Sequence, residues 1–348
     1  MAKLKIVFFG IKPNEINYLK EKLTEQDLIF FKENLSSKHL NKISDVNILS
    51  PFLHSDIDKK IINSLKNLKY ITTRSTGFDH INLKDCKEKN ILVSNVPIYG
   101  DNTVAEHTFA LILNLSRKIF KSFDQIKETG SFSLKGMQGF DLKNKALGVI
   151  GTGSIGSNVI QIANGFQMKV LAFDVNPDKK LSKKLGFKYT KTLIELLESS
   201  DIVTLHIPLN THTHHLINRD NIYKMKKGSY LINTSRGGII ETDALIKALK
   251  KKHLAGAGLD VLEGEKTINE ELEIFTSKKC EVYDLVEGYE TKEQDMKVII
   301  QNRLLINMEN VVITPHNAFN SKQALIRILD TTIENIKAFA NGKPINLV

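Results

Sequence analysis

Three ionisable side chains in the second half of the chain follow strand-like runs: Arg236, Glu265 and His316. A protonated histidine can donate a proton to the oxygen of a reacting carbonyl, and a neutral one serves as base in reverse. A neighbouring carboxylate stabilises the imidazolium and fixes its orientation. The planar guanidinium of arginine binds a carboxylate through two prongs. Each residue alone is more often structural or solvated. Together they could reduce a 2-oxo acid, provided that the chain also binds a hydride donor.

A glycine-rich stretch in the middle of the chain meets that need. It runs from apolar residues 146–150 through Gly151-Thr152-Gly153-Ser154-Ile155-Gly156 and a helical pattern to a second apolar run, 170–173, and Asp174. In a strand–turn–helix unit the first glycine allows a tight turn and the second lets a pyrophosphate approach the backbone. The third lets helix and strand pack closely. Free N–H groups at the helix N-terminus favour the phosphates.

Asp174 lies at about the ~20-residue offset expected for the acidic residue of such a unit. A carboxylate there accepts hydrogen bonds from both ribose hydroxyls and repels a 2′-phosphate, so the stretch predicts NAD rather than NADP. The expected cofactor contacts in this unit are Gly151, Gly153, Ser154, Ile155, Gly156 and Asp174. The alternative is a glycine turn in a doubly wound α/β domain that binds no nucleotide.

Strand-like and helix-like patterns alternate along the chain. Residues 1–100 contain strand patterns at 5–9, 46–49, 70–73 and 91–93 and helical patterns at 13–22 and 59–65, which predicts a small α/β domain. Strand patterns at 202–205, 230–233 and 257–259 each follow a helical stretch and predict a doubly wound parallel sheet. Further patterns are a strand at 311–314 and a helix at 321–340. Doubly wound sheets bind ligands at the carboxyl ends of their strands, where His206, Pro208, Thr234 and Asp260 lie.

A long helix is expected to begin near Asp101 and to continue to about Phe120. Its apolar surface is too broad for one face of a surface helix. We therefore expect it to be buried between domains or to pack on a second subunit.

Composition narrows the classes of partner. The net charge is +10, but only six of the 49 basic residues are arginine and the lysines are scattered. Arginine dominates recognition of phosphate and guanine, and no basic stripe with interleaved aromatic residues is present, so no nucleic-acid partner is expected. No apolar run approaches the ~20 residues of a membrane span. Cys86 and Cys280 offer no disulfide framework, which favours a cytoplasmic location.

From about Arg74 to the C-terminus, the chain resembles the D-isomer-specific 2-hydroxyacid dehydrogenase family. The motifs that carry the resemblance are RSTGFDH at 74–80, NVPIY at 95–99, VAEHT at 104–108, FSL at 132–134 with GF at 139–140, the glycine turn, NTSRG at 233–237, GLDV at 258–261 and TPHNAF at 314–319. The resemblance implies that Arg236 binds the substrate and polarises its carbonyl. It also implies that His316 is the acid/base with Glu265 as its partner. Asp260 would contact the nicotinamide carboxamide.

Two positions are similar to the D-lactate dehydrogenase branch of that family. There the hydroxyl of Tyr99 would help Arg236 to hold the substrate carboxylate, and Phe319 would line the pocket. Backbone N–H groups at Thr76 and Gly77 would add donors, and Phe52 would form another wall.

The family layout implies two Rossmann-like, doubly wound parallel-sheet domains of the α/β class with a cleft between them. Residues 1–100 plus 317–348 would form a discontinuous substrate-binding domain, and residues 101–316 the NAD-binding domain. The helix after Asp101 would form much of a homodimer interface. The segment between Glu265 and His316 is longer than the corresponding segment of the D-lactate branch usually is. This indicates an insertion within residues 266–310, near the active-site mouth. Lys266 also stands where many other branches have proline.

These patterns together predict an NAD-dependent enzyme that reduces pyruvate to D-lactate. One alternative is the same chemistry on a larger 2-oxo acid, of the 2-hydroxyisocaproate type, or on hydroxypyruvate or glyoxylate. Another is a binding protein that uses NAD to control assembly, since fold and site do not fix function.

One histidine-rich run, Thr211-His212-Thr213-His214-His215, raises the question of a metal. Three histidines with no nearby cysteine or glutamate make a poor site. A connecting loop without a metal is therefore expected.

Overall fold

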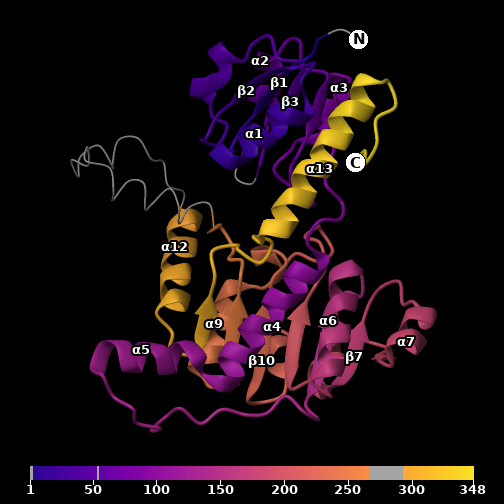
Figure 1. Ribbon diagram of the computed structural model, residues 1–348. Coiled ribbons are helices and arrows are strands. Elements are labelled where there is room, and N and C mark those ends of the chain that lie inside the picture. Colours follow the sequence, from indigo (N-terminus) through magenta and orange to yellow (C-terminus); the bar gives the residue numbers. More distant parts are fainter. Residues whose placement is uncertain (1–2, 53–54, 266–292) are drawn as a thin grey trace. The chain divides into compact units, whose positions relative to one another are not determined.

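The computed structural model describes residues 3–52, 55–265 and 293–348. Its contacts divide the chain into two compact units (Figure 1). Unit 1 comprises Met1–Tyr99 and Asn320–Val348, and unit 2 comprises Gly100–Phe319. Within the segment 266–310, for which the sequence indicates an insertion, residues 266–292, including Lys266, lie outside the described residues.

Unit 1 is built on a five-stranded parallel sheet with the strand order β2-β1-β3-β4-β5. The strands are β1 (Lys5–Phe8), β2 (Asp27–Phe30), β3 (Ile48–Ser50), β4 (Tyr70–Thr72) and β5 (Leu92–Ser94). The helices are α1 (Pro13–Lys22), α2 (Lys59–Ser64), α3 (Leu83–Glu88) and α13 (Lys322–Ala340). Because the strands are parallel, their carboxyl ends meet at one edge of the sheet, where Phe52, Thr76 and Tyr99 follow β3, β4 and β5.

Helix α13 completes the core of unit 1 from the far end of the chain. Its buried Leu329, Ile333 and Ile336 belong to the same apolar cluster as Ile6, Phe8 and Tyr70 of the sheet. Asn335, also buried, donates from its amide nitrogen to the hydroxyl of Thr72 (3.2 Å) and the carbonyl of Asn95 (2.9 Å). Unit 1 therefore depends on both ends of the sequence.

Unit 2 is built on a seven-stranded parallel sheet with the order β12-β11-β10-β9-β6-β7-β8. The strands are β6 (Ala146–Ile150), β7 (Lys169–Phe173), β8 (Lys188–Tyr189), β9 (Ile202–Leu205), β10 (Ser229–Asn233), β11 (Leu254–Leu259) and β12 (Val311–Ile313). The helices are α4 (Asp101–Arg117), α5 (Ile119–Thr129), α6 (Ser154–Gly165), α7 (Lys179–Leu185), α8 (Leu193–Ser199), α9 (Thr242–Lys250) and α12 (Glu293–Ile306). The sequence-based fold class, two parallel-sheet α/β domains, is confirmed.

The sheet of unit 2 has an apolar core on each face, because consecutive strand residues point to opposite sides. Val149 of β6 belongs to the cluster that includes Phe109 of α4 and Ile160 of α6. The next residue, Ile150, belongs to the cluster that includes Leu196 of α8 and Leu245 of α9. This double burial explains the almost continuous apolar runs of the strands.

Helix α4 is shorter than the sequence pattern predicts, and its apolar surface has another cause. It ends at Arg117, because Lys118 adopts a left-handed conformation (φ 53°), and α5 begins at Ile119. Nine α4 residues are buried within the unit. A Cβ on Gly258 of β11 would lie 3.1 Å from the Cβ of Leu111, so glycine there lets α4 approach the sheet. The breadth of the apolar surface on α4 therefore does not require a second subunit.

Several elements, among them β2, β8, α3 and α12, had no counterpart in the sequence patterns. Strand β2 was not predicted, because Asp27–Phe30 is a four-residue edge strand with only intermediate or exposed positions. Strand β10 follows a short 3-10 helix, Ile222–Lys224, rather than an α-helix. Within the described residues, no helix combines the length and apolar character that crossing a membrane requires.

Candidate active site

The glycine turn leaves space for a ligand where the sequence motif places a pyrophosphate. A Cβ on Gly153, the residue before α6, would meet no atom of the described part of the chain within 4 Å. Gly151 has φ +90°, and a Cβ there would lie 2.4 Å from the carbonyl oxygen of His206. A Cβ on Gly156 would lie 2.0 Å from the carbonyl oxygen of Gly151. The open middle position and the two close approaches fit a dinucleotide on the N-terminus of α6.

Asp174 follows β7 and is fixed beside this turn. One carboxylate oxygen accepts hydrogen bonds from the amide (2.7 Å) and the hydroxyl (2.9 Å) of Thr152, and the other accepts from the amide of Asn176 (2.9 Å). Partial burial opposes ionisation, but these hydrogen bonds outweigh it and lower the pKa of Asp174. An ionised carboxylate at this position suits ribose hydroxyls and disfavours a 2′-phosphate.

The other expected cofactor residues lie at the same edge of the sheet. His206 follows β9, and its Nε2 lies 2.9 Å from the hydroxyl of Thr204. Burial lowers the pKa of His206 to about 3, so the ring is neutral, and its buried Nδ1 has no hydrogen-bond partner among the described residues. Thr234 follows β10, and its hydroxyl lies 3.0 Å from that of Thr108 in α4. Pro208 is exposed two residues beyond His206.

His316 and Glu265 meet, although 51 positions separate them in the sequence. The Nδ1 of His316 lies 2.7 Å from Oε1 of Glu265. Both side chains are partly exposed, at 18% for His316 and 28% for Glu265. Because Nδ1 is engaged by the carboxylate, Nε2 is the nitrogen left to exchange a proton with a substrate. The rings of His316 and Phe319 are edge to face, with centroids 6.4 Å apart.

Asp260, buried at the end of β11, holds the loop that carries His316. The backbone carbonyl of Asp260 accepts from the amide of His316 (2.8 Å). Its carboxylate accepts from the amides of Asn317 and Ala318, both at 2.8 Å, and from the hydroxyl of Thr314 at 2.5 Å. These contacts fix His316 in a left-handed conformation (φ 50°). Asp260 is therefore tied to the protein on both oxygens, and its expected contact with the nicotinamide carboxamide stays a prediction.

His107 of α4 completes this network, and sequence reasoning gave it no role. Its Nε2 lies 2.9 Å from the Thr314 hydroxyl and 3.4 Å from the Asp260 carboxylate. Burial of Asp260 opposes ionisation, but the hydrogen bonds from His107, Thr314, Ala318 and Asn317 outweigh it and lower the pKa of Asp260. No spacing rule joins positions 107, 260 and 314. The only signal was that each falls in a motif shared with the family.

Arg236 follows β10 and lies on a backbone segment that packs against the turn bearing Glu265. A Cβ on Gly237 would lie 2.0 Å from the carbonyl carbon of Leu262 and 2.3 Å from the amide nitrogen of Glu263. Only glycine permits this approach. An Nη1 hydrogen bond to the carbonyl of Ser235 (2.8 Å) is one contact of the Arg236 guanidinium.

The remaining expected substrate residues lie in unit 1, at the carboxyl edge of its sheet. The hydroxyl of Thr76 donates to the carbonyl of Val96 (2.8 Å), which links the segments after β4 and β5. The carbonyl of Gly77 accepts from Ser75 Oγ (2.6 Å), and that of Tyr99 accepts from Arg327 Nε (2.5 Å). The ring of Phe52 lies under the buried guanidinium of Arg74, 5.0 Å from its central carbon.

Comparison with known proteins connects these features to a family. The sequence family described as "D-isomer specific 2-hydroxyacid dehydrogenase, NAD binding domain" matches residues 109–318 of this chain. The chain belongs to this family. It is therefore an NAD-dependent oxidoreductase that acts on 2-hydroxy or 2-oxo acids.

Three relatives illustrate the match to this 2-hydroxyacid dehydrogenase. A 2-hydroxyacid dehydrogenase homolog of Zymomonas mobilis is 35% identical over 98% of this chain and 98% of its own. An aromatic 2-oxoacid reductase of Clostridium sporogenes is 34% identical over 97% and 96% of the two chains. The crystal structure of D-lactate dehydrogenase from Aquifex aeolicus, complexed with NAD and lactic acid, is 36% identical, with a TM-score of 0.86 and 99% of each chain covered.

The Asp260 network gives a prediction for Asp260→Asn. The variant should lower the free energy of unfolding at pH 7 by about 1.5–3 kcal/mol, because buried N–H and O–H donors lose a charged acceptor. The folded-state pKa of Asp260 lies below the unfolded value of 3.8, so this stabilisation is present above about pH 4 and is lost as the pH falls through the folded-state pKa. Urea unfolding from pH 3 to pH 7 measures the difference in the free energy of unfolding between the wild type and Asp260→Asn. This difference should become smaller below pH 4.

Asp45→Asn is the matched control. Asp45 is an exposed carboxylate paired with Lys5, and such pairs contribute little to stability. Equal stability of wild type and Asp260→Asn at pH 7 would contradict the role assigned to the network.

Proposed function

We propose that this dehydrogenase reduces pyruvate to D-lactate with NADH. The observation that carries the proposal is the contact between His316 and Glu265 at the carboxyl edge of the NAD-binding sheet. The D-lactate dehydrogenase of Aquifex aeolicus, with NAD and lactic acid bound, is similar over nearly its whole length. The Tyr99 and Phe319 positions, which resemble the D-lactate branch, support the same substrate.

In the proposed reaction, His316 is the general acid. The glycine turn from Gly151 to Gly156 would hold NADH, which would supply the hydride for the carbonyl carbon of the substrate. His316 donates a proton from Nε2 to the carbonyl oxygen, and Glu265 stabilises the imidazolium through Nδ1 before that transfer. In the oxidative direction, neutral His316 takes the hydroxyl proton. Asp260 acts through the loop that it fixes and is a positioning residue.

Substrate orientation is assigned to Arg236. Its guanidinium binds the substrate carboxylate and polarises the carbonyl. We propose that the amides of Thr76 and Gly77 and the hydroxyl of Tyr99 supply further donors. From the resemblance to the D-lactate branch, we propose that Phe319 and Phe52 contact the substrate and favour a small methyl-bearing acid. We also propose a cytoplasmic location, because Cys86 and Cys280 offer no disulfide framework. In the structure, Cys86 is a buried free thiol.

The second candidate is the same reaction on a bulkier 2-oxo acid. The similarity to an aromatic 2-oxoacid reductase, at nearly the same identity as the first relative, favours keeping it. Both candidates use the same acid/base and cofactor residues, so only the pocket distinguishes them.

A substrate panel separates the two candidates. NADH oxidation is measured with pyruvate, 2-oxobutyrate, 2-oxoisocaproate, phenylpyruvate, hydroxypyruvate and glyoxylate, and NAD reduction with D- and L-lactate. We expect the highest kcat/KM with pyruvate, and activity with D-lactate only in reverse. A higher kcat/KM for phenylpyruvate or 2-oxoisocaproate would indicate that a bulkier 2-oxo acid is the substrate, with the proposed mechanism unchanged. No turnover despite NADH binding would favour the NAD-dependent binding protein.

His316→Ala tests the acid/base role. Loss of a positioned proton donor should reduce kcat with pyruvate by about 10²–10⁴-fold. NADH binding, followed by fluorescence titration, should be unchanged. His253→Ala is the control, since His253 contacts the backbone of Met225 (2.9 Å) and is assigned no part in the reaction. A kcat within threefold of wild type for His316→Ala would remove His316 from the mechanism.

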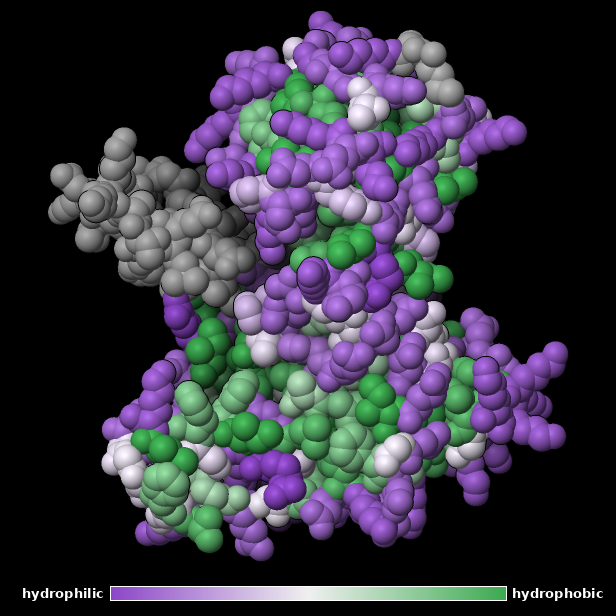
Figure 2. Space-filling view, in the orientation of Figure 1, coloured by the Kyte–Doolittle hydropathy of each residue, from purple (hydrophilic) through white to green (hydrophobic). Residues whose placement is uncertain are grey.

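We further propose that the enzyme is a homodimer and that α5 contributes to its interface with α4. No residue of α5 is buried, and Ile119, Phe120, Phe123 and Ile126 line one face with 43–59% of each residue exposed. Phe132 and Leu134, which follow this helix, are more than 80% exposed. Figure 2 shows apolar side chains gathered over α5. Exposed apolar surface of this extent is typical of an association site.

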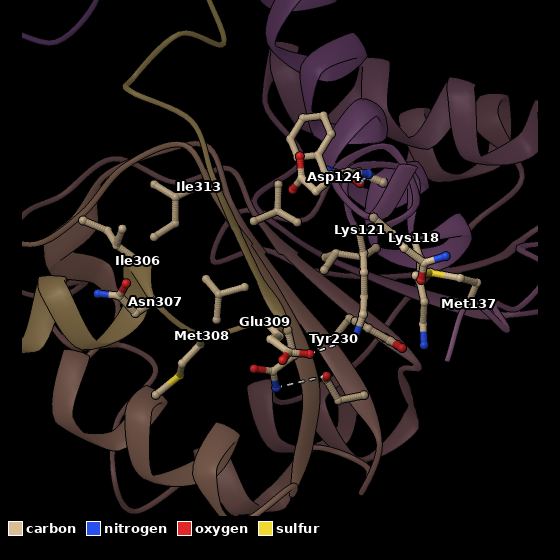
Figure 3. Close-up of a pocket in the computed structure, with 18 of the residues that line it drawn as sticks. Lys118, Lys121, Asp124, Met137, Tyr230, Ile306, Asn307, Met308, Glu309 and Ile313 are labelled. Carbon is tan, nitrogen blue, oxygen red and sulfur yellow. Dashed lines mark hydrogen bonds and ion pairs between the residues drawn. The ribbon is translucent and has the colours of Figure 1, made fainter. Parts of the chain in front are cut away.

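A hollow beside α5 gives a second copy a place to pack. It has a volume of about 910 Å³, and Phe120 is among the residues that line it. Lys118 and Asp124 lie on one side, and Ile306 and Met308 lie on the other (Figure 3). The ion pair of Lys121 with Glu309 (2.8 Å) links the two sides.

Phe123→Asp should therefore produce a monomer. A charge in a buried apolar interface carries a desolvation cost that association cannot recover. Light scattering after gel filtration should give twice the 39.3 kDa of one chain for the wild type and one chain mass for the variant. Val175→Asp is the control, because Val175 is 83% exposed and lies after β7. A monomeric wild type, or a dimeric Phe123→Asp variant, would exclude this interface.

A further inference from the structure

Two histidines and a glutamate outside the catalytic residues converge in unit 2. They are His214 and His215, in the loop after β9, and Glu263, in the turn after β11. One ligand atom from each lies within 4.8 Å of the others. The Nε2 of His215 already contacts Oε1 of Glu263 at 2.8 Å.

The loop geometry brings both imidazoles to one side. His215 adopts a left-handed conformation (φ 50°), and its amide donates to the carbonyl of Gly238 (2.8 Å). The amide of His214 donates to the carbonyl of Asn210 (2.9 Å). With both amides fixed, the two rings stack with centroids 3.9 Å apart and an interplanar angle of 28°. The pair can thus present two nitrogen ligands to one point.

Glu263 is held from two helices. Its Oε2 accepts from the hydroxyl of Thr242, at the start of α9 (2.7 Å), and its backbone carbonyl accepts from Asn302 of α12 (2.8 Å). Such supporting hydrogen bonds orient a carboxylate ligand, and they leave Oε1, the oxygen beside His215, to face a metal.

The sequence did not predict this cluster. The histidine-rich run has no glutamate or cysteine close to it along the chain, so a connecting loop was the better interpretation. The structure adds the missing carboxylate from 48 positions away, because the loops after β9 and β11 lie near each other at one edge of the sheet.

We propose that His214, His215 and Glu263 bind a zinc ion. Two imidazole nitrogens and one carboxylate oxygen form a recognised zinc ligand set, with water in the fourth tetrahedral position. Ligand bonds of about 2.0–2.2 Å require the three atoms to lie closer together than the widest separation here. His214 is exposed and can rotate inward. The ion replaces the direct contact between Nε2 of His215 and Oε1 of Glu263, since a metal ligand nitrogen cannot carry a proton.

The bound ion would connect two segments beside the active site. Glu263 is two residues before Glu265, and the same turn packs against Gly237, next to Arg236. Zinc would therefore fasten the loop after β9 to the turn that carries the partner of His316. None of the three ligands is among the residues assigned to the reaction, so the site can be tested apart from turnover.

Calorimetric titration of the tag-free, chelator-treated full-length protein with zinc chloride tests the proposal. The wild type should bind one zinc ion with a dissociation constant at or below about 10 μM. His214→Gln and Glu263→Gln should each weaken this binding at least tenfold, and glutamine at 263 can still accept the hydrogen bond from Thr242. Zinc should also raise the thermal unfolding temperature of the wild type and leave that of both variants unchanged.

His212→Gln is the matched control, because His212 lies in the same loop and outside the cluster. Its zinc affinity should equal that of the wild type, and so should the affinity of His316→Gln. Should Glu263→Gln fail to fold, the exposed position of His214 still provides the test. Absence of wild-type binding, unchanged affinity in His214→Gln, or an equal loss in His212→Gln would each overturn the proposal.

Discussion

The active-site half of unit 2 depends on one buried carboxylate. Asp260 follows β11, the strand next to the edge strand β12. Its hydrogen bonds hold the segment from Thr314 to Ala318 and, through Thr314, the side chain of His107. A buried charge is tolerated only when its hydrogen bonds are satisfied. Here that requirement also fixes the left-handed turn at His316 and directs its ring toward Glu265. Stability of the core and placement of the acid/base thus have the same cause.

Parallel strands explain why residues far apart in sequence act together. The glycine turn, Asp174, His206, Thr234 and Asp260 all follow strands of one sheet, and their positions are set by strand register. Glycines then set the spacing between the loops. Gly151 permits contact with the backbone of His206, and Gly237 permits contact with Leu262. The chemistry of the site rests on backbone distances that a methyl group would increase.

The sequence predicted features that depend on local pattern. Strand periodicity and the order of motifs can be read directly from the sequence. They indicated the dinucleotide turn with Asp174, the two parallel sheets and the family. The sequence could not predict contacts that arise only when loops from different strands meet. The bonds of His107 with Thr314 and of His215 with Glu263 are of this kind. Likewise, Lys118 adopts a backbone conformation that lysine rarely prefers, so the break between α4 and α5 had no sequence signal.

Unit 1 is formed from two separate segments of the chain, which affects how it folds during synthesis. Its sheet comes from the first 99 residues, whereas α13, which covers Ile6, Phe8 and Tyr70, is translated after the whole of unit 2. During synthesis, the apolar face of β1 and β4 is therefore not covered by α13 until the whole of unit 2 has been translated. The nascent chain is exposed to misassembly for that interval, and unit 2 has the opportunity to fold first. The final helix thus determines when unit 1 can fold, as well as how stable it is.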